Sequence, residues 1–421
     1  MPRAWPPAGA LVVCLLTASA LVPWRADALY TGGADPVVVA KAGLTAIALC
    51  LALLVARTRG QVHDVPAAPF VWVATILAIS VLGAAFDGRG VPTAVLAVRV
   101  LMVVLIVGVL HSTYRPLDVL HAVVVAFGVL VSVATVTTLL LGTTGRLHGG
   151  LPPLHANELA ALAVVCLVWV VARFFRGEDR PTSAVVVAGF VAVVLFTQSR
   201  TSLAAGATAL VIVALFATRV RLVVAAAVLW VVAVVFGLLT LSTAVDQLLT
   251  RGDGGAAQLG TFANRMYAWE AAMAPGQSFW HTWFGGGLAQ KTVEVAGQPW
   301  TSQVLDSSWV SALVQSGRVG LAVSALWVVA ILVGLLRVHR DWRGMTIALT
   351  AFLALRGFLE SGLFDATTSF LLLVTLAFTA ASYTVTEPLI RQEPDRAAAQ
   401  PISTEGDWSH GRSTAAEVSH A

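Results

Sequence analysis

Apolar runs separated by short polar turns fill most of this chain. A transmembrane helix needs about 20 predominantly apolar residues, and twelve stretches approach that length. They cover residues 8–24, 36–56, 68–86, 92–111, 117–141, 156–175, 182–199, 200–217, 220–241, 307–336, 343–359 and 363–384. The pattern predicts an all-α fold, a polytopic transmembrane helical bundle of about twelve spans.

One long segment, residues 242–306, breaks this pattern by mixing charges, glycines, tryptophans and polar residues. We expect a large aqueous loop containing short helices here, between N-terminal helices within 1–241 and C-terminal helices within 307–386. Residues 387–421 are rich in Ala, Ser, Glu and Arg without an apolar period, a composition typical of a disordered tail.

Composition agrees with the membrane assignment. The 421 residues are 58% hydrophobic and 11% charged, whereas soluble domains carry about a quarter charged residues. The arginines are scattered over the turns, which indicates membrane topology and not a nucleic-acid surface. Cys14, Cys50 and Cys166 lie inside apolar runs without paired spacing, so we interpret them as packing residues.

Arginine bias assigns the two sides of the membrane, because cytoplasmic connections carry the excess of basic residues. With the N-terminus inside, the inner turns hold Arg57, Arg59, Arg115, Arg173, Arg176, Arg180, Arg219, Arg221, Arg337, Arg340 and Arg343, and the outer turns hold Arg25, Arg89, Arg146 and Arg200. This places the large loop outside the cytoplasm and the tail inside. An alternative for the first span is a signal peptide cleaved near Ala26-Asp27-Ala28, which leaves the other spans unchanged.

Several ionisable residues lie within or at the outer ends of spans. Arg99 lies about two turns inside its span, Arg200 sits where two spans meet almost without a loop, and Arg356 is four residues before Glu360, close enough to pair. Ionisable residues inside a membrane are energetically costly, so we interpret them as candidate functional residues. The alternative is that they are interfacial anchors or structural ion pairs. Lysine is nearly absent, since only Lys41 and Lys291 occur.

Three stretches together resemble the O-antigen ligase and O-antigen polymerase superfamily of polytopic membrane glycosyltransferases. They are Arg146-Leu-His-Gly-Gly-Leu-Pro-Pro-Leu-His-Ala-Asn157-Glu-Leu-Ala160, then Gln198-Ser-Arg200-Thr-Ser-Leu, and the loop with Asn264-Arg265-Met-Tyr-Ala-Trp269, Trp283-Phe-Gly-Gly-Gly287 and Asp306-Ser-Ser-Trp309…Gln315-Ser-Gly317-Arg-Val-Gly320. We expect the glycines 285–287 to form a tight turn. The resemblance implies glycan transfer from a polyprenyl diphosphate carrier to an acceptor at the outer face of the cytoplasmic membrane.

The sequence departs from the family at Asp306, where a histidine is usual. In relatives that residue is proposed to assist the acceptor hydroxyl, so Asp306 could accept or orient its proton. An aspartate before Ser-Ser and an apolar helix could equally be a helix N-cap. His281 and Glu294 are alternative bases in the same loop.

The leaving group of such a transfer is a diphosphate, and guanidinium groups suit it because they stay charged and donate in pairs to phosphate. Arg200 and Arg265 are the first candidates, with Arg265 and Asp306 as the catalytic pair; Arg146, Arg356 and Arg99 form a second tier. Five tryptophans of the loop region could stack on sugars or anchor at the membrane interface: Trp269, Trp280, Trp283, Trp300 and Trp309.

We expect no cofactor and no metal site, because the metal and nucleotide motifs are missing. The resemblance implies metal-independent transfer with inversion at the anomeric carbon. The expected partners are the polyprenyl diphosphate-linked glycan donor, a glycan, lipid or protein acceptor, and membrane lipid, without nucleic acid. Ligase and polymerase remain open, since they differ only in the acceptor.

Two other classes of protein are alternatives. A glycolipid or polysaccharide transporter or flippase usually has two related halves with polar residues near mid-membrane, whereas here the single large loop lies in the second half. A scaffold for envelope assembly is the third possibility, and it gives no reason for the outer arginines.

Overall fold

The computed structural model describes residues 5–25, 35–60, 63–142, 145–178, 182–217, 265–274, 278–295 and 302–398. Their helices are α1 (Ala8–Leu21), α2 (Pro36–Arg59), α3 (Ala68–Phe86), α4 (Gly90–Thr113), α5 (Pro116–Leu141), α6 (Ala156–Phe175), α7 (Thr182–Phe196), α8 (Arg200–Leu215), α12 (Phe279–Phe284), α13 (Ser308–Leu335), α14 (Arg340–Arg356) and α15 (Thr368–Ala398). Residues 265–273 form one more helix. Strands β1 (Thr292–Glu294) and β2 (Ser302–Val304) pair antiparallel, with Val293 opposite Gln303.

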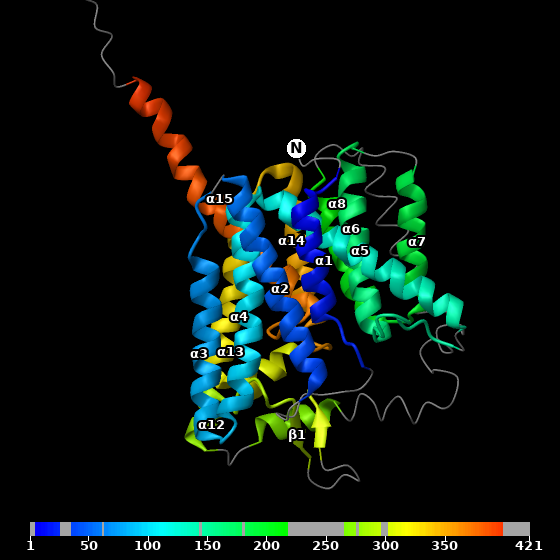
Figure 1. Ribbon diagram of the computed structural model, residues 1–421, viewed down its shortest axis with the longest axis vertical. Coiled ribbons are helices and arrows are strands. Elements are labelled where there is room, and N and C mark those ends of the chain that lie inside the picture. Colours follow the sequence, from blue (N-terminus) through cyan, green and yellow to red (C-terminus); the bar gives the residue numbers. More distant parts are fainter. Residues whose placement is uncertain are drawn as a thin grey trace, which may run out of the picture.

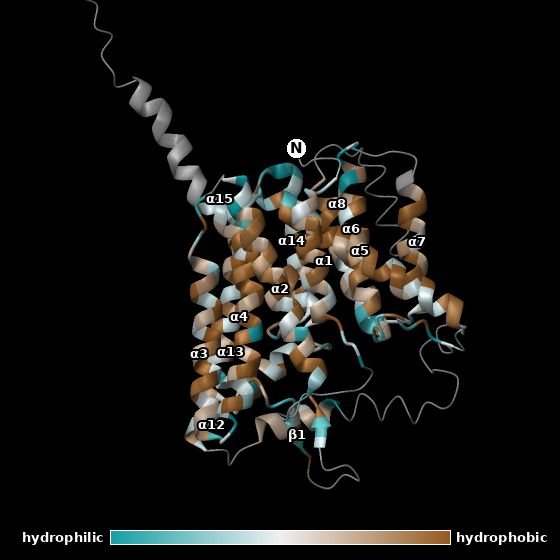
Figure 2. Cartoon of the chain, viewed as in Figure 1, coloured by the Kyte–Doolittle hydropathy of each residue, from teal (hydrophilic) through white to brown (hydrophobic). Residues whose placement is uncertain are grey.

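The mostly helical architecture is confirmed. Within the described ranges, six helices are long and apolar enough to cross a membrane, namely α2, α3, α4, α5, α6 and α13, and shorter apolar helices lie at 8–21, 184–196, 200–215 and 368–384. The expected ninth span, 220–241, lies outside the described residues, so the total of about twelve stays a prediction. Hydrophobic residues predominate along these helices (Figure 2), and apolar side chains that are exposed include Leu54 on α2 and Val71 on α3.

Helix boundaries coincide with capping residues, prolines and glycines in the sequence. Asp35 caps α2 by accepting from the Val37 amide at 2.8 Å, with Pro36 in the first turn, and Gly60 ends the helix at φ 64°. Such signals are local, which explains why most span boundaries are close to those expected. The last helix is an exception, because α15 continues to Ala398 and so enters the segment predicted to be a disordered tail.

Helix α15 runs through the middle of the bundle, where it packs against α13, α5, α4 and α14 (Figure 1). Its Phe370 and Phe378 are 1% and 0% exposed. Around it, α1 packs on α2 and α5, and α14 packs on α8. The apolar core is therefore shared by elements from both halves of the chain.

Helix α12 and the β1–β2 ribbon lie together at one end of the bundle (Figure 1), which we call the loop end. The short helices expected in the loop are present as 265–273 and α12, while the ribbon was not foreseen. Residues 242–264, 275–277 and 296–301 of the expected loop lie outside the described residues. The ends of α3 and α13 meet this region, since α12 packs on both.

Glycines join the loop end to helix α13. Gly317 interrupts α13 with φ 66° and ψ −170°, and an added Cβ there would lie 2.2 Å from the Trp283 carbonyl carbon. Gly285, at φ 74°, faces the same kink, and the next two amides donate to Val314 O at 2.9 Å and Gln315 O at 3.0 Å. The tight turn expected for glycines 285–287 is confirmed, and its role is backbone-to-backbone packing.

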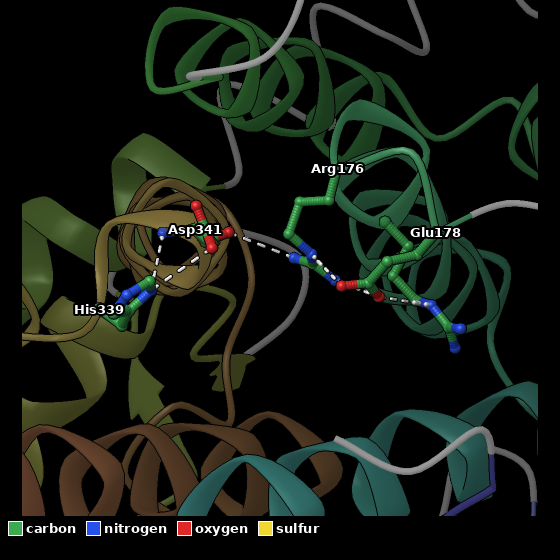
Figure 3. A network of polar contacts seen from close by, with 5 residues as sticks. Arg176, Glu178, His339 and Asp341 are labelled. Carbon is green, nitrogen blue, oxygen red and sulfur yellow. Dashed lines mark hydrogen bonds and ion pairs between the residues drawn. The ribbon is translucent and has the colours of Figure 1, made fainter. Parts of the chain in front are cut away.

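A polar network ties α6 to α14 at the opposite end of the bundle (Figure 3). Arg176 donates to both Glu178 carboxylate oxygens at 3.0 and 3.2 Å and to the Asp341 backbone oxygen at 3.3 Å. Its guanidinium carbon lies 3.2 Å from the centroid of the Trp342 ring. His339 caps α14 through the Asp341 amide. These residues fix the helices far from the loop end.

Candidate functional site

The first and second motif stretches meet at the start of α6. Arg146 donates through Nε to Thr197 O at 2.6 Å and through Nη2 to Asn157 Oδ1 at 2.7 Å. The Leu147 amide donates to Phe196 O at 3.0 Å, so the segment around Arg146 lies against the turn between α7 and α8. Two stretches separated by about 40 residues of sequence are thus one unit in space.

Arg200 is the first residue of α8, and its side chain is exposed. Ser199 caps the helix, and the preceding Gln198 takes a left-handed conformation with φ 51°. Ser202, one turn further on, lies 3.4 Å from Asn157 O through its hydroxyl. The predicted break between the two helices is confirmed as a tight turn that presents Arg200 beside the start of α6.

The third stretch supplies an ion pair. Arg265, at the start of helix 265–273, lies 3.4 Å from Asp306 (Nε to Oδ2), and their side chains are 20% and 38% exposed. The N-cap of α13 is Ser307, which accepts from the Val310 amide at 3.4 Å, and not Asp306. The capping alternative for Asp306 is therefore wrong, because the cap falls one residue later and leaves the carboxylate facing Arg265.

Glu360 connects these pieces from the turn between α14 and α15. Its Oε1 accepts from Asn157 Nδ2 at 2.5 Å, although the two residues are 203 positions apart. Its backbone oxygen accepts from the Ser308 hydroxyl at 2.7 Å and the Ser308 amide at 3.1 Å. One residue thereby joins the starts of α6 and α13 to the end of α14.

The expected ion pair between Arg356 and Glu360 is not formed. Arg356 is 7% exposed, and its Nη1 donates to Ser369 Oγ at 3.1 Å, while Glu360 bonds to Asn157 instead. Helix α14 ends at Arg356, so the side chains no longer follow the i to i+4 alignment of a helix. Arg356 Nε is buried without a hydrogen-bond partner among the described residues.

Burial raises the pKa of the Glu360 carboxyl above its ordinary value. The Arg356 and Arg265 guanidinium groups and the Asn157 hydrogen bond oppose this effect without cancelling it, and the Asp306 carboxylate adds to it. Glu360 is thus a carboxyl group that holds its proton more tightly than a solvated one.

A second charged group surrounds Asp365, in the turn before α15. Lys291, beside strand β1, forms an ion pair with its carboxylate, and Arg99 and Lys41 lie within electrostatic reach. Burial raises the pKa of Asp365, but Lys291, the Ala366 amide and Arg99 together hold that pKa below its usual range. Arg99 is 8% exposed, and its Nε has no hydrogen-bond partner in the described part of the chain.

The remaining candidates are placed as follows. Glu294 is exposed on β1, and His281 lies on α12. Trp280 stacks on Phe86 with ring centroids 4.1 Å apart, and Trp309 donates to Ala354 O at 3.2 Å, so both pack against helices. Trp300 lies outside the described residues, and so does the alternative cleavage site near Ala26-Asp27-Ala28.

Sequence reasoning missed part of this arrangement. Asn157 belongs to the first motif stretch and Glu360 to the expected pair with Arg356, but no local sequence pattern predicts the contact between Asn157 and Glu360. The sequence did offer a signal for Lys41, Lys291 and Asp365. Charged residues in or beside membrane spans are rare in a chain with 11% charged residues, and such residues are candidates for functional sites. Both lysines of the chain lie around the same carboxylate.

A comparison with protein families agrees with the motifs. Residues 183–325 match the family described as O-Antigen ligase. The resemblance to the O-antigen ligase and polymerase superfamily is confirmed. No curated protein matches the chain. The matched segment holds Arg200, Arg265, Asp306 and the Gly317 kink, while Arg146 and Glu360 contact or adjoin it from outside.

The O-antigen ligase match and the apolar helices support a multi-pass membrane protein with a ligase- or polymerase-type function in polysaccharide assembly. They also support a glycosyltransferase-like enzyme that handles lipid-linked glycan.

Proposed function

We propose that this protein is an O-antigen ligase-like glycosyltransferase that moves glycan from a polyprenyl diphosphate carrier to an acceptor at the outer face of the cytoplasmic membrane. The observation that carries the proposal is the convergence of the three motif stretches. Arg146 bonds to Asn157, Asn157 bonds to Glu360, and the Arg265–Asp306 pair lies within electrostatic reach of Glu360.

The chemistry of the leaving group explains the arginines. Negative charge builds on the diphosphate oxygens as the glycosidic bond breaks, and fixed cations at a low-dielectric boundary stabilise it. Arg200 and Arg265 are the principal donors in this proposal, because one is exposed at a helix start and the other is only partly buried. Arg146, Arg356 and Arg99 support them; Arg356 and Arg99 each carry a buried Nε without a hydrogen-bond partner among described residues.

The family resemblance supports the rest of the reaction. We propose direct displacement with inversion at the anomeric carbon, without a metal ion or another cofactor. Asp306 stands where relatives carry a histidine; here it pairs with Arg265 and orients that guanidinium. The arginine bias of the turns supports an extracytoplasmic site.

Deletion of the gene followed by analysis of surface glycan and of carrier-linked glycan tests the function. Loss of chain length with single repeats retained indicates a polymerase, whereas accumulation of full-length carrier-linked glycan indicates a ligase. Unchanged glycan in the deletion strain refutes both forms of the proposal.

Arginine variants test the site in the same strain. Arg200→Ala and Arg265→Ala are expected to lower transfer by about 10²–10³-fold, the loss typical of removing one donor to a developing anion. Arg89→Ala is the matched control, because Arg89 is an exposed arginine at the start of α4 whose ion pair is with Asp87 at 3.3 Å. Equal transfer by all three variants, at equal amounts of protein in the membrane, contradicts the phosphate-binding role.

A further inference from the structure

Glu360 lies at the point where the motif stretches meet, and the family match does not include it, since that match ends at residue 325. We propose that Glu360 is the catalytic base that takes the proton from the acceptor hydroxyl. This inference rests on the glycosyl transfer proposed above and names a further residue for it. Asp306 then acts only as the partner that orients Arg265.

The position of the Glu360 carboxylate is fixed by a chain of hydrogen bonds. Asn157 holds Oε1 at 2.5 Å, and Arg146 holds Asn157 at 2.7 Å while also donating to Thr197 O. A side chain held through successive hydrogen bonds keeps one orientation, as a catalytic group requires. The arginine and asparagine of the first motif thereby acquire a concrete purpose, which is to aim this carboxylate.

The backbone around Glu360 is equally constrained. Ser308 donates twice to its carbonyl oxygen, and the Glu360 amide donates to Arg356 O at 3.0 Å. The Leu363 amide donates to the Ser308 hydroxyl at 3.1 Å, so the turn is closed on both sides of Glu360. Because Ser308 begins α13, these hydrogen bonds fix the position of the turn that carries Glu360 relative to the residues around Asp306.

The two carboxylates differ in their surroundings. Asp306 is 38% exposed, and its Oδ2 is engaged in the ion pair with Arg265 at 3.4 Å. Glu360 is partly buried, and its hydrogen bond from Asn157 comes from a neutral amide. Pairs of carboxyl groups whose environments differ in this way usually divide the roles of a site between them.

The step balances without another reactant. The acceptor hydroxyl oxygen forms a bond to the anomeric carbon of the donor, and the bond from that carbon to the diphosphate oxygen breaks. The electron pair of the broken bond remains on the diphosphate, next to Arg265 and Arg200. The hydroxyl proton moves to the Glu360 carboxylate, which later releases it to water.

The charged state of Glu360 controls the pH dependence of this step. Since its pKa lies above the ordinary glutamate value of about 4.3, transfer is expected to rise with pH through that raised pKa, as the base becomes deprotonated. The titratable and charged groups that face Glu360 are Arg356 of α14, Arg265 of helix 265–273, Asp306 before α13 and Glu158 of α6. The arginines stay charged over this pH range, so variants of Asp306 and Glu158 are needed to show that the pH profile reports on Glu360 and not on another carboxyl.

The test uses purified full-length protein in lipid vesicles with undecaprenyl diphosphate-linked glycan from the deletion strain. Glu360→Gln keeps the side-chain shape and an amide oxygen for Asn157, and it removes the proton acceptor. We expect transfer to fall by about 10²–10⁴-fold, with unchanged binding of undecaprenyl diphosphate by native mass spectrometry. The rising limb of the pH profile should disappear in Glu360→Gln and persist in Asp306→Asn and in Glu158→Gln.

Several results overturn the proposal. Transfer by Glu360→Gln at the wild-type rate does so, as does loss of the rising limb in Asp306→Asn instead. If Glu360→Gln proves too unstable to purify, Glu360→Asp replaces it. This variant keeps a carboxylate, so we expect slower transfer whose rate still rises with pH, and a pH profile without a rising limb rejects Glu360 as the base. Failure of the glycosyl transfer itself is distinguishable, because then the wild-type protein shows no transfer in the same vesicles.

Discussion

Substitution of Gly317 by alanine disturbs the contact between α13 and the loop end at its tightest point. At φ 66° and ψ −170° the residue occupies a region that is essentially restricted to glycine, and another residue there is strained by about 1–3 kcal/mol. The added Cβ would lie 2.2 Å from the Trp283 carbonyl carbon and 2.3 Å from the Phe284 amide nitrogen. Ordinary contact between such atoms is about 3.5 Å, so the two backbones must separate by roughly 1 Å.

The sign of this effect distinguishes the kink from a regular helix. In a regular helix, glycine to alanine stabilises by about 1 kcal/mol. In α13 we expect the opposite, a destabilisation of about 2–4 kcal/mol, because the separation also weakens the hydrogen bonds from Gly286 and Gly287 to Val314 and Gln315. Asp306 directly precedes the cap of α13, so a displacement of this helix should lower transfer as well.

Thermal unfolding in detergent, followed by size-exclusion chromatography, measures the stability part. Gly128→Ala in α5 is the matched control, since its added Cβ would meet Cys166 Sγ at 3.7 Å and Phe190 at 3.8 Å, which is ordinary contact. We expect a lower melting temperature for Gly317→Ala and an unchanged or higher one for Gly128→Ala. Equal or greater stability of Gly317→Ala than of Gly128→Ala refutes the reasoning.

Three further measurements address other contacts. Arg176→Ala removes the guanidinium that lies over Trp342 and should lower stability by about 2 kcal/mol in thermal unfolding while transfer is unchanged; loss of transfer contradicts a site at the loop end. Asp365→Asn leaves Lys291 without its partner and should cost about 3 kcal/mol at pH 7. Because the pKa of Asp365 is lowered, its contribution is complete above about pH 4 and is lost as the pH falls through that lowered pKa, so the two melting curves should converge there; equal melting at pH 7 rejects the pairing. Arg265→Lys keeps the charge but not the planar donor pair, so transfer should fall at least about tenfold, and wild-type transfer shows that charge alone suffices.

Local signals in the sequence were enough to predict most helices. These signals are the length of an apolar run, a proline in the first turn such as Pro36, and a glycine after the last turn such as Gly60. Each depends on only a few neighbouring residues, and the helix ends in the structure agree with them. The glycine turn at 285–287 was equally readable, because few other residues tolerate such backbone angles.

Contacts between distant segments could not be read in this way. The bond from Asn157 to Glu360 spans 203 positions, and no periodicity encodes it. The i to i+4 rule suggested a pair between Arg356 and Glu360, but the rule applies only inside a helix, and α14 ends at Arg356. The two roles left open for Asp306 could not be separated from the sequence either, since Asp306 and Ser307 are both good caps and the structure shows Ser307 as the cap and Asp306 paired with Arg265.

The two lysines around Asp365 make the site open to spectroscopy. Reductive methylation with a ¹³C label modifies primary amines, and Lys41 and Lys291 are the chain's only lysine side chains. Each labelled protein therefore carries two side-chain reporters, Lys291 in the ion pair with Asp365 and Lys41 within electrostatic reach of Asp365 and Arg99. Changes of their methyl resonances on addition of a donor or an acceptor would follow occupancy of the loop end directly, without any engineered cysteine.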